Sequence, residues 1–325
     1  MSEPFHGVLP ALTTPFTEDG GAIDTGALAA NVERLIGGGV AGLVPGGSTG
    51  EFTTLSHAER RELVEATVAA AAGRVPVVAG TGALSTAETV ELSRHAERAG
   101  AAAVMIVPPF YEALSWRELL AHYTAVADAI AIPIMYYNLP SASGVRLSAE
   151  QLRELPVTSL KDTGGDATAA TELIQTDGPT LLNGWDTLTF AALAAGVRAV
   201  VWGTASILPA QCVELHRLLL DDIDLPAARE LWARLWPLCK FLEGQSYSAA
   251  VKTACRLVGD ITGPVRAPLL ELDEDATTEL AQLLTESSGS VEERLSSRVE
   301  GVSHDSLSPH SPRGSTAVVA GRPAG

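Results

Sequence analysis

The sequence lacks the motifs of metal, disulfide and dinucleotide chemistry. Its three cysteines, Cys212, Cys239 and Cys255, lie in helix-like segments without a CxxC or metal-ligand spacing, which favours free thiols in a reducing cytoplasm. There is no HxH or HExxH pair, and no GxGxxG follows a strand and opens a helix. Metal hydrolysis and dinucleotide chemistry are therefore disfavoured.

Positive charge and long apolar runs are also scarce. The 22 Lys and Arg residues face 39 Asp and Glu residues, and the net charge of -17 argues against nucleic acid or an anionic membrane as a partner. No apolar run reaches the length of a membrane span, and no basic region followed by an apolar run opens the chain. We expect a soluble cytoplasmic protein. Excess acid repels anionic ligands at long range, so a bound carboxylate needs local donors such as the N–H groups of glycine loops.

What the sequence does contain is an alternation of short apolar runs and longer helical patterns, which is typical of βα units around a parallel sheet. Capping boxes open several of the helical patterns, at Ser56 with Glu59, Ser85 with Glu88, Ser115 with Glu118 and Ser148 with Gln151. Eight such units predict a TIM (β/α)8 barrel. The strand candidates are Val8–Thr13, Ala41–Val44, Val75–Ala79, Ala103–Val107, Ile134–Tyr137, Ser159–Lys161, Thr180–Asn183 and Ala199–Trp202.

The pattern changes after the last of these strands. Residues 1–205 form the predicted barrel core, and residues 206–285 show only helical periodicity, with breaks near Leu225-Pro226, Gly244-Gln245 and Gly263-Pro264. We interpret this second part as the last barrel helix and an appended C-terminal helical region. Residues 286–325 are rich in Ser, Gly, Pro and Arg, and we expect a disordered tail.

The candidate nucleophile is Lys161, at the end of a predicted strand, in Ser159-Leu160-Lys161-Asp162-Thr163-Gly164-Gly165-Asp166. In a TIM barrel the active site is built at the carboxyl ends of the strands. A buried amine can lose its proton by desolvation and then attack a keto group to form a Schiff base. The alternative is an ordinary solvated surface lysine.

Three other strand ends carry candidate groups. The turn Pro45-Gly46-Gly47-Ser48-Thr49-Gly50-Glu51 can hold a carboxylate or be an ordinary glycine turn. Tyr137 is either a proton-transfer group or a core tyrosine, and Tyr111 is either a second such phenol or part of a packed lid. Asp186 is either a helix N-cap or a hydroxyl-binding group.

These motifs together resemble the dihydrodipicolinate synthase / N-acetylneuraminate lyase family. The resemblance covers roughly Phe5 to Leu284 and keeps the order and spacing of the motifs. It implies a TIM barrel with a C-terminal helical region, usually a homotetramer, and a Schiff-base enzyme that acts without a cofactor on pyruvate or related 2-keto acids. The matching stretches are Gly47-Ser48-Thr49-Gly50-Glu51, Pro109-Phe110-Tyr111, Tyr137-Asn138-Leu139-Pro140, the Lys161 motif, and Lys252…Gly259…Gly263-Pro264-Val265-Arg266-Ala267-Pro268-Leu269.

The resemblance also implies roles for single residues. Lys161 would form the imine, Ser48 and Thr49 would hold the pyruvyl carboxylate, and Tyr137 would transfer protons. Tyr111 would reach in from a neighbouring subunit and complete a relay with Ser48 and Tyr137. The remaining predicted substrate-binding residues are Gly47, Thr163, Gly184, Asp186 and Ser206.

Three departures from the family pattern bear on the second substrate. Ala142 stands where dihydrodipicolinate synthases carry a carboxylate-binding arginine, and Arg146 is out of register. Thr187 and Gly203 replace a glutamate and a serine that sialic acid lyases use. We therefore expect a carbon–carbon lyase that joins or releases pyruvate and an aldehyde, with a short 2-keto-3-deoxy sugar acid or another 4-hydroxy-2-keto acid as its substrate. The alternatives are 4-hydroxy-tetrahydrodipicolinate synthase despite the missing arginine, a sugar-acid dehydratase that uses the same imine, and a barrel that binds keto acids without turnover.

Overall fold

The computed structural model describes residues 5–288, and residues 289–325 of the tail predicted over 286–325 lie outside them. Seven parallel strands within these residues form one sheet in the order β1-β7-β6-β5-β4-β3-β2. From β2 to β7, each strand pairs with the next one along the chain, as repeated βα units require, and β1 pairs with β7. The strands are β1 (Gly7–Pro10), β2 (Val78–Gly80), β3 (Ala103–Ile106), β4 (Ile134–Asn138), β5 (Ser159–Asp162), β6 (Thr180–Asn183) and β7 (Ala199–Trp202).

The sheet closes through the segment predicted as the second strand. Leu43 bridges Val77 next to β2, and Val44 bridges Ala11 next to β1, both in parallel. The predicted strand Ala41–Val44 is thus reduced to two bridging residues. Pro45 has no N–H to continue the ladder, and a Cβ on Gly42 would lie 3.0 Å from Leu9, so the segment is confined to a short close approach. The predicted TIM barrel is confirmed, with this one irregular position.

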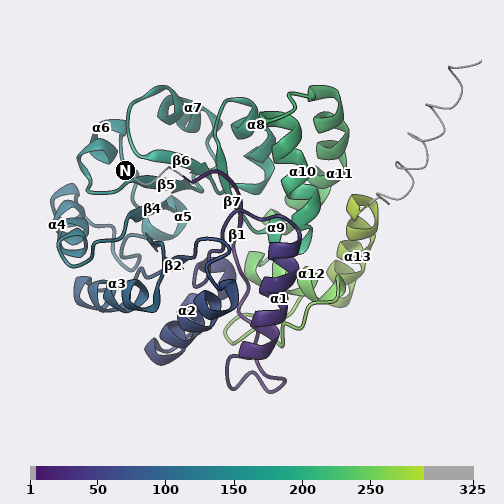
Figure 1. The fold of residues 1–325 in the computed structure, drawn as a ribbon, viewed down its shortest axis with the longest axis horizontal. Coiled ribbons are helices and arrows are strands. Elements are labelled where there is room, and N and C mark those ends of the chain that lie inside the picture. The colour runs from purple at the N-terminus through teal and green to yellow at the C-terminus, as the bar shows by residue number, and fades with distance from the viewer. Residues whose placement is uncertain (1–4, 289–325) are drawn as a thin grey trace, which may run out of the picture. The chain divides into compact units, whose positions relative to one another are not determined.

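Helices form the layer outside the strands (Figure 1). Reciprocal capping boxes open α2, α4 and α6 at Ser56, Ser115 and Ser148, as predicted. At Ser85 the hydroxyl caps the Glu88 N–H and also donates to the Glu88 carboxylate. The barrel helices are α1 (Thr25–Gly37), α2 (His57–Ala71), α3 (Thr86–Ala99), α4 (Trp116–Ala127), α5 (Pro140–Ser143), α6 (Ala149–Glu154), α7 (Ala167–Gln175), α8 (Thr189–Ala194), α9 (Thr204–Ile207) and α10 (Pro209–Leu220), with short 3-10 turns η1 (Ser48–Gly50), η2 (Phe52–Thr54) and η3 (Asp186–Leu188).

Three further helices form the C-terminal region: α11 (Leu225–Gly244), α12 (Tyr247–Leu257) and α13 (Glu274–Ser288). The predicted breaks coincide with the start of α11, its end and the non-helical stretch before α13. Leu235 and Leu280 share one buried core with Val8 and Trp202 of the barrel. Helix α13 continues to Ser288, past the expected boundary at 285. Among residues 5–288, no helix has both the length and the apolarity that a bilayer crossing demands.

Candidate active site

Lys161 lies inside the barrel on β5, between Tyr137 of β4 and Leu182 of β6 in the strand register. Its side chain is 5% exposed, and Nζ lies 4.3 Å from the centroid of the Tyr137 ring. The sequence has only two other lysines. Lys252 is paired with Glu51, and Lys240 lies over the ring of Trp236. Within residues 5–288, Lys161 is in no ion pair, so its amine is buried without a compensating carboxylate.

Gly184 holds the other side of the lysine. This residue follows β6, and a Cβ placed on it would lie 2.8 Å from Cε and 2.9 Å from Cγ of Lys161. The same Cβ would lie 2.7 Å from Cγ2 of Thr163. Thr163 is fixed in turn, because its N–H and its hydroxyl both donate to the carbonyl of Asn138. The lysine stem is therefore confined between the Tyr137 ring and the backbone at Gly184.

Alternation along β4 separates its two tyrosines, as a pleated strand requires. Tyr136 packs in the layer between strands and helices, against Tyr123, and burial raises the pKa of its phenol. Tyr137 faces the barrel interior, where its hydroxyl lies 3.4 Å from Oγ of Ser48. That distance is long for a bond between hydroxyls, but catalytic hydrogen bonds often tighten only when the substrate is bound.

The glycine turn at Ser48 stands directly after the bridging segment 43–44. Gly46 has a φ of +71°, which lets the chain turn sharply before η1. Thr49 is buried, and the hydroxyl of Thr14 holds the turn by donating to the carbonyl of Gly50. From α12, the hydroxyl of Ser248 donates to the carbonyl of Ser48 at 2.8 Å. Thr14 and Ser248 therefore hold the turn from two different segments, and the turn itself carries the hydroxyls of Ser48 and Thr49.

A buried ion pair anchors the same turn. Glu51, with a φ of 57°, accepts from Nζ of Lys252 at 2.7 Å, and neither side chain is exposed. The Lys252 amine also donates to the carbonyl of Pro264, and the N–H of Arg266 donates to Glu51. Burial lowers the pKa of Lys252, while the Glu51 charge opposes that effect. Sequence reasoning named both residues within motifs but did not pair them, because nothing in a sequence pattern brings positions so far apart together.

Asp186 is buried and already hydrogen-bonded. Its Oδ1 accepts from the Tyr247 hydroxyl at 2.8 Å, and its Oδ2 accepts from the Thr204 hydroxyl at 2.7 Å. Burial raises its pKa from 3.8 to about 6, against these two bonds. Asp186 is the first residue of η3, whose N-cap residue is Trp185. Sequence reasoning missed Tyr247 altogether.

A small cavity lies between the glycine turn and Tyr137, and it opens beside the ring of Phe52. Phe52 itself packs edge-on against Phe110 and under the guanidinium of Arg60. The wall of this cavity is mostly apolar or backbone. Its lining residues are Gly46, Gly47, Phe52, Gly80, Gly82, Met105, Val107 and Tyr137.

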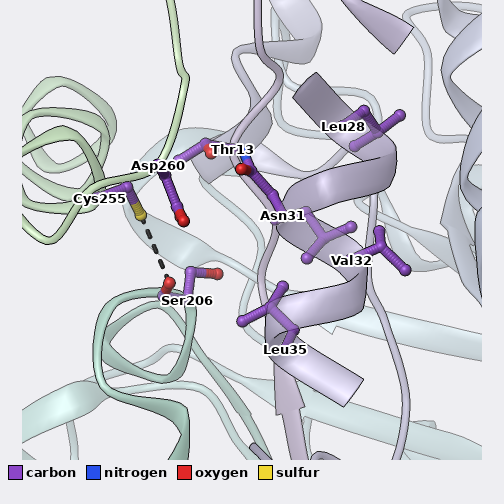
Figure 2. A pocket seen from close by; sticks show the side chains of 9 residues that line it. Thr13, Leu28, Asn31, Val32, Leu35, Ser206, Cys255 and Asp260 are labelled. Carbon is purple, nitrogen blue, oxygen red and sulfur yellow. Dashed lines mark hydrogen bonds between the residues drawn. The ribbon is translucent and has the colours of Figure 1, made fainter. Parts of the chain in front are cut away.

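Two predicted site residues have other surroundings in this chain. The Ser206 hydroxyl donates to the carbonyl of Ala11, and Ser206 lines a second cavity beside α1, with Cys255 donating to its carbonyl (Figure 2). Its hydroxyl is therefore engaged in holding α9 to the end of β1. Tyr111 is 87% exposed, so in the single chain it does not pack against Lys161.

The chain is similar to known proteins over most of its length. The model of the dihydrodipicolinate synthetase family matches residues 4–287. A protein from Sorangium cellulosum named 4-hydroxy-tetrahydrodipicolinate synthase is 41% identical, over 86% of this chain and 95% of the relative. One of the same name from Methanopyrus kandleri is 40% identical, over 85% of this chain and 94% of the relative.

Solved structures agree with this similarity. A putative dihydrodipicolinate synthetase from Pseudomonas aeruginosa superposes with a TM-score of 0.83 at 36% identity, covering 87% of this chain and 99% of its own. YagE, a prophage protein of E. coli K12 solved in complex with pyruvate, superposes with a TM-score of 0.83 at 30% identity and the same coverage.

Proposed function

The chain belongs to the dihydrodipicolinate synthetase family, and from this premise we propose that it is a Schiff-base aldolase that joins pyruvate to an aldehyde or releases it again. The observation that carries the proposal is the buried Lys161 amine, which has no carboxylate partner among residues 5–288 and lies against Tyr137. The pyruvate bound in YagE, a relative of the same fold, supports the choice of keto acid.

The proposed mechanism begins at the Lys161 amine. Nζ attacks the keto carbon of pyruvate, and the resulting carbinolamine takes up a proton at its hydroxyl and loses water to give a protonated imine. The imine withdraws electrons, so a proton leaves C3 and an enamine forms. C3 then attacks the aldehyde carbon, the new oxyanion takes up a proton, and water releases the product from the lysine. Run backwards, the same steps cleave a 4-hydroxy-2-keto acid.

The groups around the lysine fit these proton and charge movements. Tyr137 is the proposed proton carrier, because its ring lies 4.3 Å from Nζ of Lys161 and its hydroxyl lies 3.4 Å from Oγ of Ser48. Ser48 and Thr49, with the N–H groups of the turn that begins at Gly47, are the proposed site for the pyruvyl carboxylate. Hydroxyl and amide donors can hold the carboxylate there without adding a second positive charge beside the lysine.

The second substrate is proposed to be an aldehyde without a carboxylate. Ala142 lies on α5, at the end of β4, and supplies no charge there. An anion buried without a forked donor loses the charge-assisted bonds that would offset its desolvation. This supports a short 2-keto-3-deoxy sugar acid or another 4-hydroxy-2-keto acid as the substrate for cleavage.

A second candidate is 4-hydroxy-tetrahydrodipicolinate synthase, the name of the relatives at 41% and 40% identity. Arg146 is the arginine that would serve it: burial raises the pKa of Asp162 at the end of β5, and the Arg146 charge opposes that effect. Efficient turnover of aspartate semialdehyde that is lost in Arg146→Ala would favour this candidate. Loss of water from a sugar acid through the same imine remains an alternative outcome of the assays.

We also propose a homotetramer in which Tyr111 completes the relay of a neighbouring subunit. Support comes from its side chain, which is 87% exposed in the single chain although it is a large aromatic. The free, buried cysteines support a reducing, cytoplasmic location.

The test is trapping followed by turnover. The protein is incubated with pyruvate and borohydride, its mass is measured, and aldehydes and candidate sugar acids are then assayed for pyruvate consumption or release. We expect a pyruvate adduct in the wild type and none in Lys161→Ala. A wild-type protein without an adduct would refute the aldolase, and an adduct without any turnover would favour the non-catalytic keto-acid-binding barrel.

A further inference from the structure

The Tyr247 phenol fills the space where the carboxyl ends of β6 and β7 meet. Tyr247 is the first residue of α12, and its hydroxyl donates to Oδ1 of Asp186, which follows β6. Gly203, which follows β7, lies against the same phenol. A Cβ on Gly203 would lie 2.0 Å from the Tyr247 hydroxyl and 2.8 Å from its ring carbon Cζ. The absence of a side chain at 203 is what makes room for the phenol.

The turn that binds this phenol also borders the reacting lysine. The turn that carries Asp186 begins at Gly184, where an added Cβ would lie 2.8 Å from Cε of Lys161. Residues 184–186 therefore link the segment beside Lys161 to the Tyr247 hydroxyl. Gly184, Asp186 and Gly203 all follow parallel strands, so the phenol lies at the rim of the barrel where the carboxyl ends of those strands meet.

Ser248, the residue after Tyr247, ties the start of α12 to the glycine turn. Ser248 donates to the carbonyl of Ser48, in the turn proposed to hold the pyruvyl carboxylate. The first turn of α12 therefore spans from that carboxylate turn to the ends of β6 and β7. Tyr247 is held in this span by its hydrogen bond and by packing against the core around Leu235 and Trp202.

The other carboxylate oxygens beside Tyr247 already accept hydrogen bonds. Oδ2 of Asp186 takes the hydroxyl of Thr204, and Glu243 takes the N–H and the hydroxyl of Thr187. A polyhydroxylated aldehyde that extended into the corner would find a phenyl ring and carboxylates that already have donors. Hydroxyl groups desolvated there without partners would weaken binding.

Resting on the aldolase function proposed above, we propose that Tyr247 limits the length of the aldehyde, so that the enzyme takes short aldehydes and excludes longer sugars. Tyr247 is a specificity-determining residue that closes the β6–β7 corner of the site. The hydroxyl bond to Asp186 keeps the ring in place, but the ring supplies the barrier.

The test compares chain length across matched variants. Values of kcat/KM with pyruvate are measured for glycolaldehyde, glyceraldehyde, erythrose and N-acetylmannosamine in the wild type, Tyr247→Ala and Tyr247→Phe. We expect the ratio of erythrose to glycolaldehyde to rise about tenfold or more in Tyr247→Ala, the scale that added space in a pocket gives. Tyr247→Phe keeps the ring and should keep the wild-type ratio, with any change falling on all aldehydes alike.

Two results would overturn the inference: the same length ratio in Tyr247→Ala as in the wild type, or an equal change in Tyr247→Phe. Borohydride trapping of pyruvate on Lys161 in all three proteins distinguishes a failure of the Tyr247 proposal from a misfolded variant or a failure of the aldolase function. An adduct in Tyr247→Ala shows that this variant is folded, so an unchanged ratio then counts against Tyr247 alone. A wild-type protein that forms no adduct refutes the aldolase function itself.

Discussion

Replacing Gly184 by alanine tests whether the lysine is positioned by its contact with the turn after β6. The added Cβ would lie 2.8 Å from Cε of Lys161, whereas ordinary contact begins at 3.4 Å, so one of the two must retreat by about 0.6 Å. Thr163, at 2.7 Å from the same Cβ, is tied by two bonds to Asn138 and yields less easily than the flexible lysine stem. The displacement therefore falls mainly on the nucleophile.

The expected loss follows from that displacement. A misplacement of about 1 Å costs about a hundredfold in rate, so the smaller shift should slow imine formation about tenfold or somewhat more. Overpacking should also destabilise the fold by about 1–3 kcal/mol. Imine formation is measured by quenching pyruvate mixtures with borohydride at increasing times, and stability is measured by urea unfolding.

The control is Gly37→Ala, because a Cβ on this glycine at the end of α1 meets nothing within 4 Å. It should leave both the rate and the stability close to the wild-type values. A Gly184→Ala protein that forms the imine at the wild-type rate would refute the reasoning, since the lysine would then not depend on the wall that Gly184 provides.

Three further predictions concern groups around the site. Lys252→Met leaves Glu51 buried and unpaired, so it should lower the free energy of unfolding by about 3–5 kcal/mol. The exposed control Lys240→Met should change the free energy of unfolding little. Equal losses in the two variants would contradict the role of the buried pair. Burial raises the pKa of Asp186 to about 6, so the folded protein disfavours the ionised carboxylate. The free energy of unfolding should therefore fall by on the order of 3 kcal/mol as the pH rises from below 3.8 through about 6. In Asp186→Asn that part of the decline should be absent from urea unfolding measured across this range, and an unchanged pH dependence would show that another group causes it. Ala142→Arg should raise kcat/KM for aspartate semialdehyde about tenfold, since it supplies a forked donor for the second carboxylate; no gain would mean that this position does not face the aldehyde.

The parts of the site on strands could be predicted from the sequence. Apolar runs followed by helical periods locate strand ends, and the ends of parallel barrel strands meet at one rim, so Tyr137, Lys161 and Gly184 were expected together. The structure places the Lys161 stem between the other two. The predicted strand Ala41–Val44 is too long, since only Leu43 and Val44 bridge residues next to other strands. An apolar run alone does not reveal how far the pairing extends before Pro45.

The parts supplied by the C-terminal helices could not be predicted. Periodicity indicates that α12 is amphipathic, but it does not say where the helix docks. Only its docked position brings Lys252 to Glu51 and Tyr247 to Asp186. For the same reason Ser206 was expected to bind substrate, although its hydroxyl donates to the carbonyl of Ala11. Side-chain partners between distant segments follow from packing, which a single sequence does not show.

The most direct test of the account is to map the trapped adduct among the three lysines of the chain. After incubation with pyruvate and borohydride, the protein is digested and the peptides that contain Lys161, Lys240 and Lys252 are compared by mass spectrometry. The account predicts that the reduced pyruvyl group is found on Lys161 alone, because Lys252 is paired with Glu51 and Lys240 lies over Trp236 away from the barrel interior. An adduct on Lys240 or Lys252, or none on Lys161, would contradict it.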